Sequence, residues 1–337
     1  MTKTRSRFVW PLVPLLLLAA AWAACGQGLG PEVYGIVAEF GMSAPTPTRQ
    51  LGMGAPITCL DDVQYANPAF AAVRRVSDAS VRLNLTDLER GPLLTSVLAN
   101  YSYALHPGQS GLQFSVLDLS SSGGDTVLPG LGPVTVDMSE NAFVVDYGRR
   151  LGEKLTGGLS VLGSNRVELH VDNPLAPLLD LGTRMDYGGR VGLAYEWLPG
   201  DFLGLLYSFA QDTVHTNGAM TGGVERRTIF HSDQLAVGAS RHLNSEVLVM
   251  VEFQRATLRN ASFHRSVESW QLGGEYQVTP QWALRAGSDD GAPTFGLGYS
   301  DSRWRVDYAF LQDWKYASSG RLFGGSDTHS VQASYCW

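Results

Sequence analysis

Residues 328–337 (THSVQASYCW) alternate between apolar and small or polar side chains up to an aromatic final residue. One face of an extended strand would carry Val331, Ala333, Tyr335 and Trp337. Such period-two alternation is typical of a strand whose two faces meet different environments. The last residues of most domains fray, so a strand patterned to its end is expected to be paired.

The same alternation recurs along the chain from residue 79. Residues 185–197 (MDYGGRVGLAYEW) place large apolar or aromatic groups on one face, and residues 304–310 do the same. Most of these segments run 10 to 14 residues. They exceed the usual strand of about 5–6 residues and match the roughly 9–11 that a tilted strand needs to cross a bilayer. The fourteen predicted strands are 79–89, 94–105, 111–121, 141–151, 155–167, 185–197, 201–212, 230–243, 245–257, 266–278, 281–288, 294–300, 303–316 and 327–337.

The connections between these strands are sorted by length. Those after even-numbered strands are short, whereas those after odd-numbered strands include the long segments 122–140, 168–184, 213–229, 258–265 and 317–326. A soluble sandwich has no reason for this sorting, but an outer-membrane barrel has short periplasmic turns and longer outside loops. We therefore predict an all-β fold, a transmembrane antiparallel β-barrel of about 14 strands in the bacterial outer membrane, surrounded by outer-membrane lipid.

A barrel accounts for the C-terminal pattern. The last strand must pair with the first, because unpaired backbone groups in lipid cost several kcal/mol each. Tyr335 and Trp337 would then join an aromatic girdle at the membrane interface. A terminal strand that ends in an aromatic residue also resembles the signal read by the barrel assembly machinery. We predict that Val331, Ala333, Tyr335 and Trp337 form that signal.

The start of the chain indicates export. Residues 1–23 combine a basic start, an apolar run and an Ala-Trp-Ala cleavage site, which is typical of a signal peptide. Cys25 could instead carry lipid. We expect residues 24–75 to form an N-terminal extension with a plug-like segment, and residues 76–337 to form the barrel.

Charge and cysteine content narrow the possible functions. The formal net charge is −7 and becomes about −10 without the signal, which argues against nucleic acid as a partner. Three cysteines are too few for a disulfide-built fold. A bridge between Cys59 and Cys336 is left open. The seven histidines show no HExxH spacing, and no G-x-S-x-G sequence occurs. No catalytic site, metal or cofactor is therefore expected.

Residues 49–71 (RQLGMGAPITCLDDVQYANPAFA) form a distinct motif before the first strand. No Gly-Lys-Ser/Thr follows its Gly-x-Gly, so nucleotide binding is not expected. The order of the motif resembles the N-terminal signature of PorV/PorQ-type outer-membrane proteins, relatives of FadL-like transporters of hydrophobic compounds. The usual G-M-G-G-A lacks one glycine here. The signature positions are Arg49, Leu51, Gly52, Met53, Gly54, Asp61, Asp62, Asn67 and Pro68. The resemblance implies a fourteen-stranded barrel with an N-terminal segment in or across the lumen.

Charges on the faces opposite the apolar ones are expected to point into the lumen. Such charges are tolerated where they pair or meet water. The predicted lumen-facing charges are Arg82, Asp146, Arg150, Asp186, Arg190, Glu196, Arg285, Arg305 and Asp307.

Two functions follow from the resemblance and from residues 122–140 (SGGDTVLPGLGPVTVDMSE). Exposed apolar patches usually mark partners, and this outside segment carries Val127, Leu128, Leu131 and Val134. We expect a PorV-like scaffold that binds exported proteins or a secretion or surface complex. The alternative is a FadL-like transporter of small hydrophobic molecules across the outer membrane, with the plug as its gate.

Overall fold

The computed structural model describes residues 46–60, 66–88, 93–121, 124–128, 132–173, 176–217, 225–261, 264–312 and 326–337. The predicted signal peptide, Cys25, Asp61, Asp62 and Leu131 lie outside these residues. Among the described residues, none of the helices is long and apolar enough to cross a membrane.

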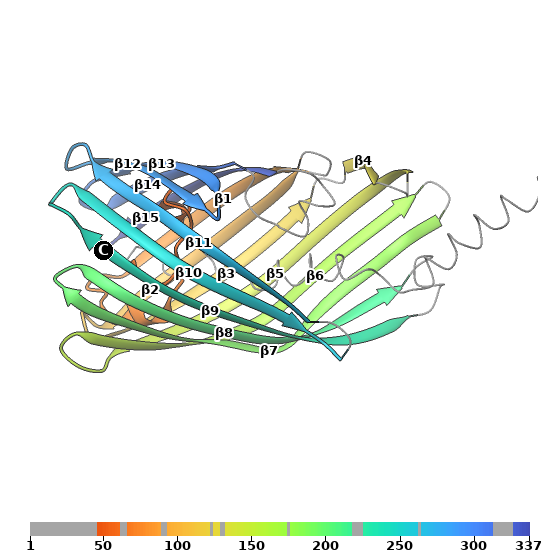
Figure 1. Cartoon of the computed structure of the whole chain (residues 1–337), viewed down its shortest axis with the longest axis horizontal. Coiled ribbons are helices and arrows are strands. Elements are labelled where there is room, and N and C mark those ends of the chain that lie inside the picture. The colour runs from red at the N-terminus through yellow and green to blue at the C-terminus, as the bar shows by residue number, and fades with distance from the viewer. Residues whose placement is uncertain are drawn as a thin grey trace, which may run out of the picture.

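The chain folds into one sheet of long, tilted antiparallel strands (Figure 1). Alternating side chains favour strands throughout, as the sequence predicts. The strands are β1 (Asp78–Leu88), β2 (Leu94–His106), β3 (Ser110–Ser121), β4 (Gly124–Leu128), β5 (Gly132–Arg150), β6 (Leu155–Asn173), β7 (Ala176–Leu198), β8 (Asp201–Asn217), β9 (Arg226–His242), β10 (Val247–Arg259), β11 (His264–Gln277), β12 (Trp282–Asp289), β13 (Ala292–Ser300), β14 (Trp304–Leu311) and β15 (Ser326–Cys336).

The sheet closes into a barrel of fourteen strands. β15 pairs with β1 along its whole length, with Val331 opposite Leu83. β3 pairs with β5, so the short strand β4 lies outside the ring and adds only to β5. The backbone N–H of Trp337 donates to the carbonyl of Ser77 at 3.1 Å, which continues the seam to the last residue. The predicted fourteen-stranded barrel and the pairing of its terminal strands are confirmed.

The two ends of the barrel differ. At one end, called here the turn end, brief turns such as residues 107–109 and 199–200 join the strands. The opposite end, the loop end, is where β1 stops and β2 starts. By the usual arrangement of outer-membrane barrels, the turn end faces the periplasm.

Strands β5 to β8 are longer than the sequence predicts. Much of the sequence expected to form outside loops is paired strand. Backbone hydrogen bonding continues beyond the segments in which outward-facing positions are apolar. In particular, the described residues 124–128 and 132–140 are paired strand rather than open loop. Val127 and Leu128 belong to β4 and Val134 to β5, with Thr126 opposite Val134.

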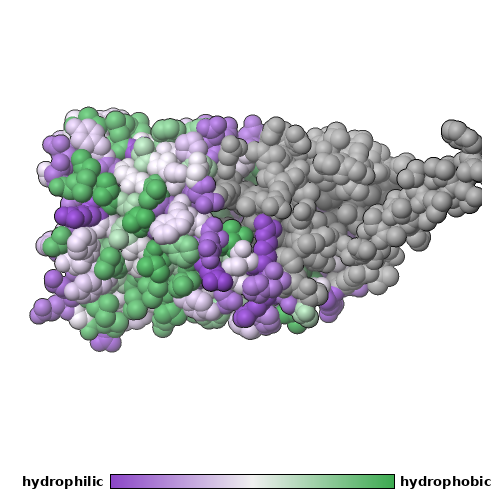
Figure 2. All heavy atoms as spheres, in the orientation of Figure 1, coloured by the Kyte–Doolittle hydropathy of each residue, from purple (hydrophilic) through white to green (hydrophobic). Residues whose placement is uncertain are grey.

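The outer face of the wall is apolar and the inner face is polar. On β1, Val81, Leu83 and Leu85 are 38–55% exposed, whereas the intervening Arg82 and Asn84 are buried. Hydrophobic residues are spread over the described wall in Figure 2. Aromatic pairs cluster near the turn end, where the Trp304 and Tyr335 rings lie 4.9 Å apart and the Tyr101 and Trp337 rings 5.9 Å apart. This pattern is that of a lipid-facing wall with an aromatic girdle.

Candidate functional site

The lumen holds a plug made of residues 46–60 and 66–73. It contains the helix α3 (Thr48–Leu51) and the 3-10 helix η1 (Pro68–Ala72), and it lies within the turn-end half of the barrel (Figure 1). Leu51, Met53 and Phe70 are almost completely buried. The predicted signature positions from Arg49 to Gly54, together with Asn67 and Pro68, all lie in this plug.

The wall against the plug is lined with glycine. A Cβ atom on Gly158 would overlap the backbone of Pro68 and Ala69, and one on Gly204 would overlap the carbonyl of Thr58. Glycine inside a strand often marks such a close approach of another backbone. We call this set the glycine belt: Gly111, Gly148, Gly158, Gly192, Gly204, Gly238, Gly273, Gly287 and Gly296.

The belt follows the register of the sheet. Gly111, Gly148, Gly158 and Gly192 lie opposite one another on β3, β5, β6 and β7. Gly204 pairs with Gly238, and Gly273 pairs with Gly287. The belt is therefore a strip without side chains, on which the plug backbone rests.

β10 has no glycine and contributes Glu252 instead. This fully buried carboxylate accepts hydrogen bonds from the backbone N–H groups of Ile57 (2.9 Å) and Thr58 (2.7 Å) and from the Thr58 hydroxyl. Gln254 donates to it from the neighbouring inward position at 2.7 Å. A buried charge needs such partners, so Glu252 fixes the middle of the plug to the wall.

Asn67 connects the two parts of the plug. Its Nδ2 lies 3.0 Å from the carbonyl oxygen of Thr58 and 3.2 Å from that of Leu193 in β7. Its Oδ1 accepts a hydrogen bond from the N–H of Ala69 at 3.0 Å, which caps η1. Asparagine is preferred at such caps because its side chain satisfies a free N–H group.

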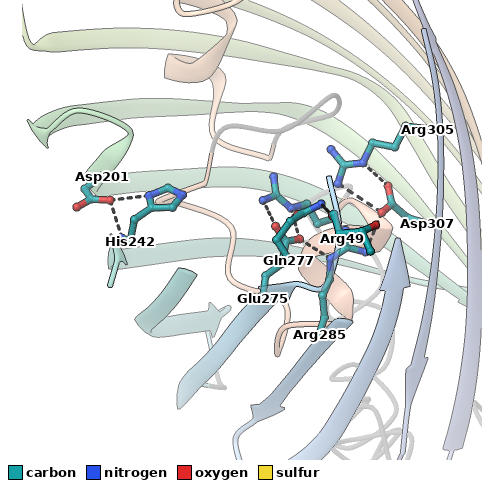
Figure 3. Close-up of polar contacts among 9 residues, drawn as sticks. Arg49, Asp201, His242, Glu275, Gln277, Arg285, Arg305 and Asp307 are labelled. Carbon is teal, nitrogen blue, oxygen red and sulfur yellow. Dashed lines mark hydrogen bonds and ion pairs between the residues drawn. The ribbon is translucent and has the colours of Figure 1, made fainter. Parts of the chain in front are cut away.

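A chain of alternating charges ties the plug to three strands (Figure 3). Arg49 pairs with Glu275 at 2.6 Å, and Glu275 pairs with Arg285 at 2.6 Å. Asp307 then pairs with Arg285 and with Arg305, both at 2.7 Å. The structure places the predicted Arg285, Arg305 and Asp307 together inside the barrel. Glu275 was not among the predicted residues.

Three further predicted charges lie inside the wall, and two of them contact the plug. Arg82 donates to the carbonyl of Thr46. Arg190 donates to the carbonyl of Ala66 at 3.3 Å and lies 3.6 Å from Asp146. All three charged side chains are buried.

Asp186 corrects the prediction. It was expected to face the lumen, but it is exposed and accepts hydrogen bonds from Gln211 (3.0 Å) and Thr213 (2.8 Å) on the outer face. The register of β7 against β8 shifts there, since Met185 lies opposite Asp212 and Tyr187 opposite Gln211. An irregularity of one residue reverses the side to which the following side chains point.

The predicted Arg150 and Glu196 lie at the turn end rather than inside the wall. Arg150 is exposed and Glu196 half-buried. Both line a cavity of about 700 Å³, called here the turn-end chamber, together with Arg49, Leu60, Val73, Arg75, Phe202, His242 and Leu248 and the turn residues 107–109 and 200. Within it, His242 Nδ1 lies 2.8 Å from Asp201 Oδ1 (Figure 3).

The loop end of the lumen is lined differently. Several inward-facing positions there carry apolar side chains that are at most 6% exposed, beside buried polar ones such as Asp289, Ser326 and Thr328. Leu88 and Leu311 are the last residues of their strands, and Leu94 is the first of its strand. We call this set the apolar collar: Leu88, Leu94, Leu119, Phe230, Leu258 and Leu311.

The described part of the chain contains two of the three cysteines. Cys59 and Cys336 are both free, so the bridge left open by the sequence is absent. Burial, with a smaller contribution from Glu252, raises the pKa of the Cys59 thiol well above its usual range. The described residues contain no group of three or more side chains able to hold a metal ion.

Comparisons with known proteins identify the fold. No protein-family model and no curated protein sequence matches the chain. Among solved structures, it is similar to the toluene transporter TbuX of Ralstonia pickettii (TM-score 0.55, 15% identity, 88% of this chain and 98% of that one). It is also similar to the Pseudomonas putida toluene transporter TodX (0.56, 14%, 85% and 96%) and to a Pseudomonas aeruginosa FadL homologue (0.56, 13%, 87% and 98%).

At this identity the likeness is one of fold. The chain has the architecture of the FadL-like outer-membrane barrels, and this supports an outer-membrane location. The similar structures are those of transporters rather than enzymes.

Proposed function

We propose that this protein is a conduit for small hydrophobic molecules across the outer membrane. The observation that carries the proposal is the apolar collar at the loop end. A polar, water-filled pore would be expected to carry polar side chains at these positions. Sites for small molecules are mostly apolar with a few placed polar groups. Two of the structures with the same fold are named as toluene transporters.

The route below the collar is closed by the plug. Its backbone rests on the glycine belt and its side chains are buried. Entry at the collar therefore precedes a step in which the plug or the wall gives way. The ionic attachment of Arg49 to Glu275 is one of the parts of the plug that border the turn-end chamber, since Arg49 also lines that chamber.

Uptake measurements test the proposal. The protein would be expressed in a host that lacks its own FadL-like protein, and the uptake of labelled toluene would be followed. Phe230→Gln and Leu258→Gln make the collar polar and should reduce uptake by about tenfold, since one buried apolar group is worth roughly 1.5–3 kcal/mol. Thr257→Gln, on the outer face beside Leu258, is the matched control. Equal uptake with and without the protein would refute the proposal.

A second candidate function is docking of exported or surface-associated proteins, which the PorV/PorQ-type resemblance implies. The supporting observation is β4, which pairs on one side with β5 and ends the strand order of the described sheet. An extended peptide can add to such an edge. Gentle detergent extraction from the native membrane, followed by mass spectrometry, would test it. A stoichiometric protein partner that is lost when residues 124–128 are deleted supports docking.

A further inference from the structure

The turn-end chamber brings two arginines together around one turn. The N–H of Gly108 donates to the carbonyl of Arg74 at 2.6 Å, and the N–H of Arg150 donates to the carbonyl of Gln109 at 2.7 Å. The turn of residues 107–109 is thus held between the end of the plug and the end of β5. Arg75, which follows Arg74, and Arg150 both line the chamber as a result.

These two arginines give the chamber an excess of positive charge. Arg49 also lines it and is paired with Glu275. Glu196 is the one carboxylate among the described lining residues and offsets one of the positive charges, while its Oε1 accepts a hydrogen bond from the N–H of Gly200 at 3.0 Å. Among the described residues, no carboxylate forms a salt bridge with Arg75 or Arg150. The chain as a whole carries a net charge of −7, so this concentration of cations runs against its overall balance.

The plug side of the chamber is apolar. Leu60, Val73, Phe202 and Leu248 line it there. The Phe202 ring is held edge-on against Phe70 at 5.1 Å, which fixes its orientation. The volume of about 700 Å³ lies within the range of roughly 300–1,000 Å³ that is usual for small-molecule sites.

We infer that the turn-end chamber is a binding site for a small organic anion. Arg75 and Arg150 bind its carboxylate, and its apolar body packs against Val73 and Phe202. Guanidinium groups suit this role because they form paired hydrogen bonds with carboxylates and stay charged at any physiological pH. The chamber lies on the turn-end side of the plug and the collar at the loop end, so this inference does not depend on the proposed uptake function.

Fluorine NMR on the full chain in detergent tests the site with 4-fluorobenzoate as the probe. The neutral 4-fluorobenzamide has nearly the same shape and should bind about tenfold more weakly, because it lacks the charge-assisted hydrogen bonds. Arg75→Gln and Arg150→Gln should each weaken benzoate binding about tenfold. Arg241→Gln is the control, because Arg241 is at the same end but stacks on Trp197 at 5.7 Å.

Both arginines are at the surface of the chamber, so the single variants should fold. The shift in gel mobility on heating, which reports a closed barrel, checks this for each variant. Equal affinity for benzoate and benzamide, or unchanged affinity in both arginine variants, would overturn the inference. If inorganic phosphate displaced benzoate at equal concentration, the arginines would recognise charge alone. That result would overturn the claim that the apolar body of the ligand contributes to binding.

Discussion

Glu252 Oε2, on the inner wall, lies 2.7 Å from the backbone nitrogen of Thr58 in the plug and accepts its hydrogen bond. This contact replaces, on β10, the close approach that glycine allows on the neighbouring strands. Along the glycine belt and at Glu252, the plug is therefore attached largely through its backbone, and the wall supplies either an empty space or an acceptor.

Glu252→Ala should loosen the middle of the plug. The N–H groups of Ile57 and Thr58 would lose their acceptor, and each unsatisfied buried group costs about 1–3 kcal/mol. We expect faster cleavage of residues 46–60 by added protease in the detergent-solubilised barrel, with the barrel itself intact. Glu246→Ala, in an exposed turn, is the control. A cleavage rate equal to that of the unaltered protein would contradict this role of Glu252.

Gly158→Val should displace η1. The new side chain would occupy the position of the Pro68 backbone, and overpacking a well-packed region costs typically 1–3 kcal/mol or more. The expected result is a lower yield of folded barrel, measured by gel mobility before and after heating. Gly182→Val offers a matched control, because that glycine is also in a strand but nothing lies within 4 Å of its added Cβ. Similar yields for the two variants would show that the belt tolerates side chains.

Glu275→Gln should destabilise the barrel far more than Glu268→Gln. The first change leaves Arg49 and Arg285 without their shared carboxylate in a largely buried site, and breaking a buried pair costs about 3–5 kcal/mol. Glu268 lies 3.9 Å from Arg255, and both are more than half exposed, where pairs are worth about 0–1 kcal/mol. Denaturant unfolding followed by tryptophan fluorescence would measure both. Equal denaturation midpoints for the two variants would mean that the chain of alternating charges contributes little to the stability of the barrel.

Removal of Trp337 should slow insertion into the outer membrane. Its backbone continues the seam to Ser77, and its ring lies 5.9 Å from Tyr101 and 6.0 Å from Tyr335. A final aromatic residue is also our predicted signal to the barrel assembly machinery. Trp337→Phe should keep normal insertion, and Cys336→Ser should have no effect. The measurement is the folded fraction in isolated membranes after a pulse of synthesis.

Cys59 should resist alkylation while the barrel is folded. The thiolate is the reactive form, and burial raises the pKa of this thiol, so less thiolate is present at pH 7–8 than for an ordinary cysteine. Cys336 is partly exposed and should react sooner. Peptide mapping after treatment with N-ethylmaleimide, before and after denaturation, would measure both. Rapid labelling of Cys59 in the folded state would show that the plug opens often.

The sequence predicts the barrel well because period-two alternation is a local property of each strand. It places β1 to β3 within a residue or two and identifies the closing strand from residues 328–337. It misses the extension of β5 to β8, since hydrogen-bonded strands outside lipid need no apolar face. The register shift near Asp186 is also invisible, because alternation alone does not show where one residue is skipped.

The site is less predictable than the fold. The sequence indicates that Arg190 and Asp307 face inward, but not which groups lie opposite them. Glu252 and Glu275 gain their roles from plug residues about 190 to 230 positions away. The glycine belt could have been predicted from the sequence, because glycines occupy inward-facing positions on successive strands, as at Gly148, Gly158 and Gly192. Their common meaning appears only when the strands are placed side by side.

The plug also constrains the order in which the molecule can be assembled. Thr48 contacts Gln332 and Ser330, which lie 284 and 282 positions later, in the last strand. The strands made in between supply the belt, so the plug and the closing strand can meet only after those strands have been made. We expect the β1–β15 seam to close around a segment already in position. The N-terminal segment would then act as the core around which the wall closes, and the glycine belt marks the positions at which the wall contacts it.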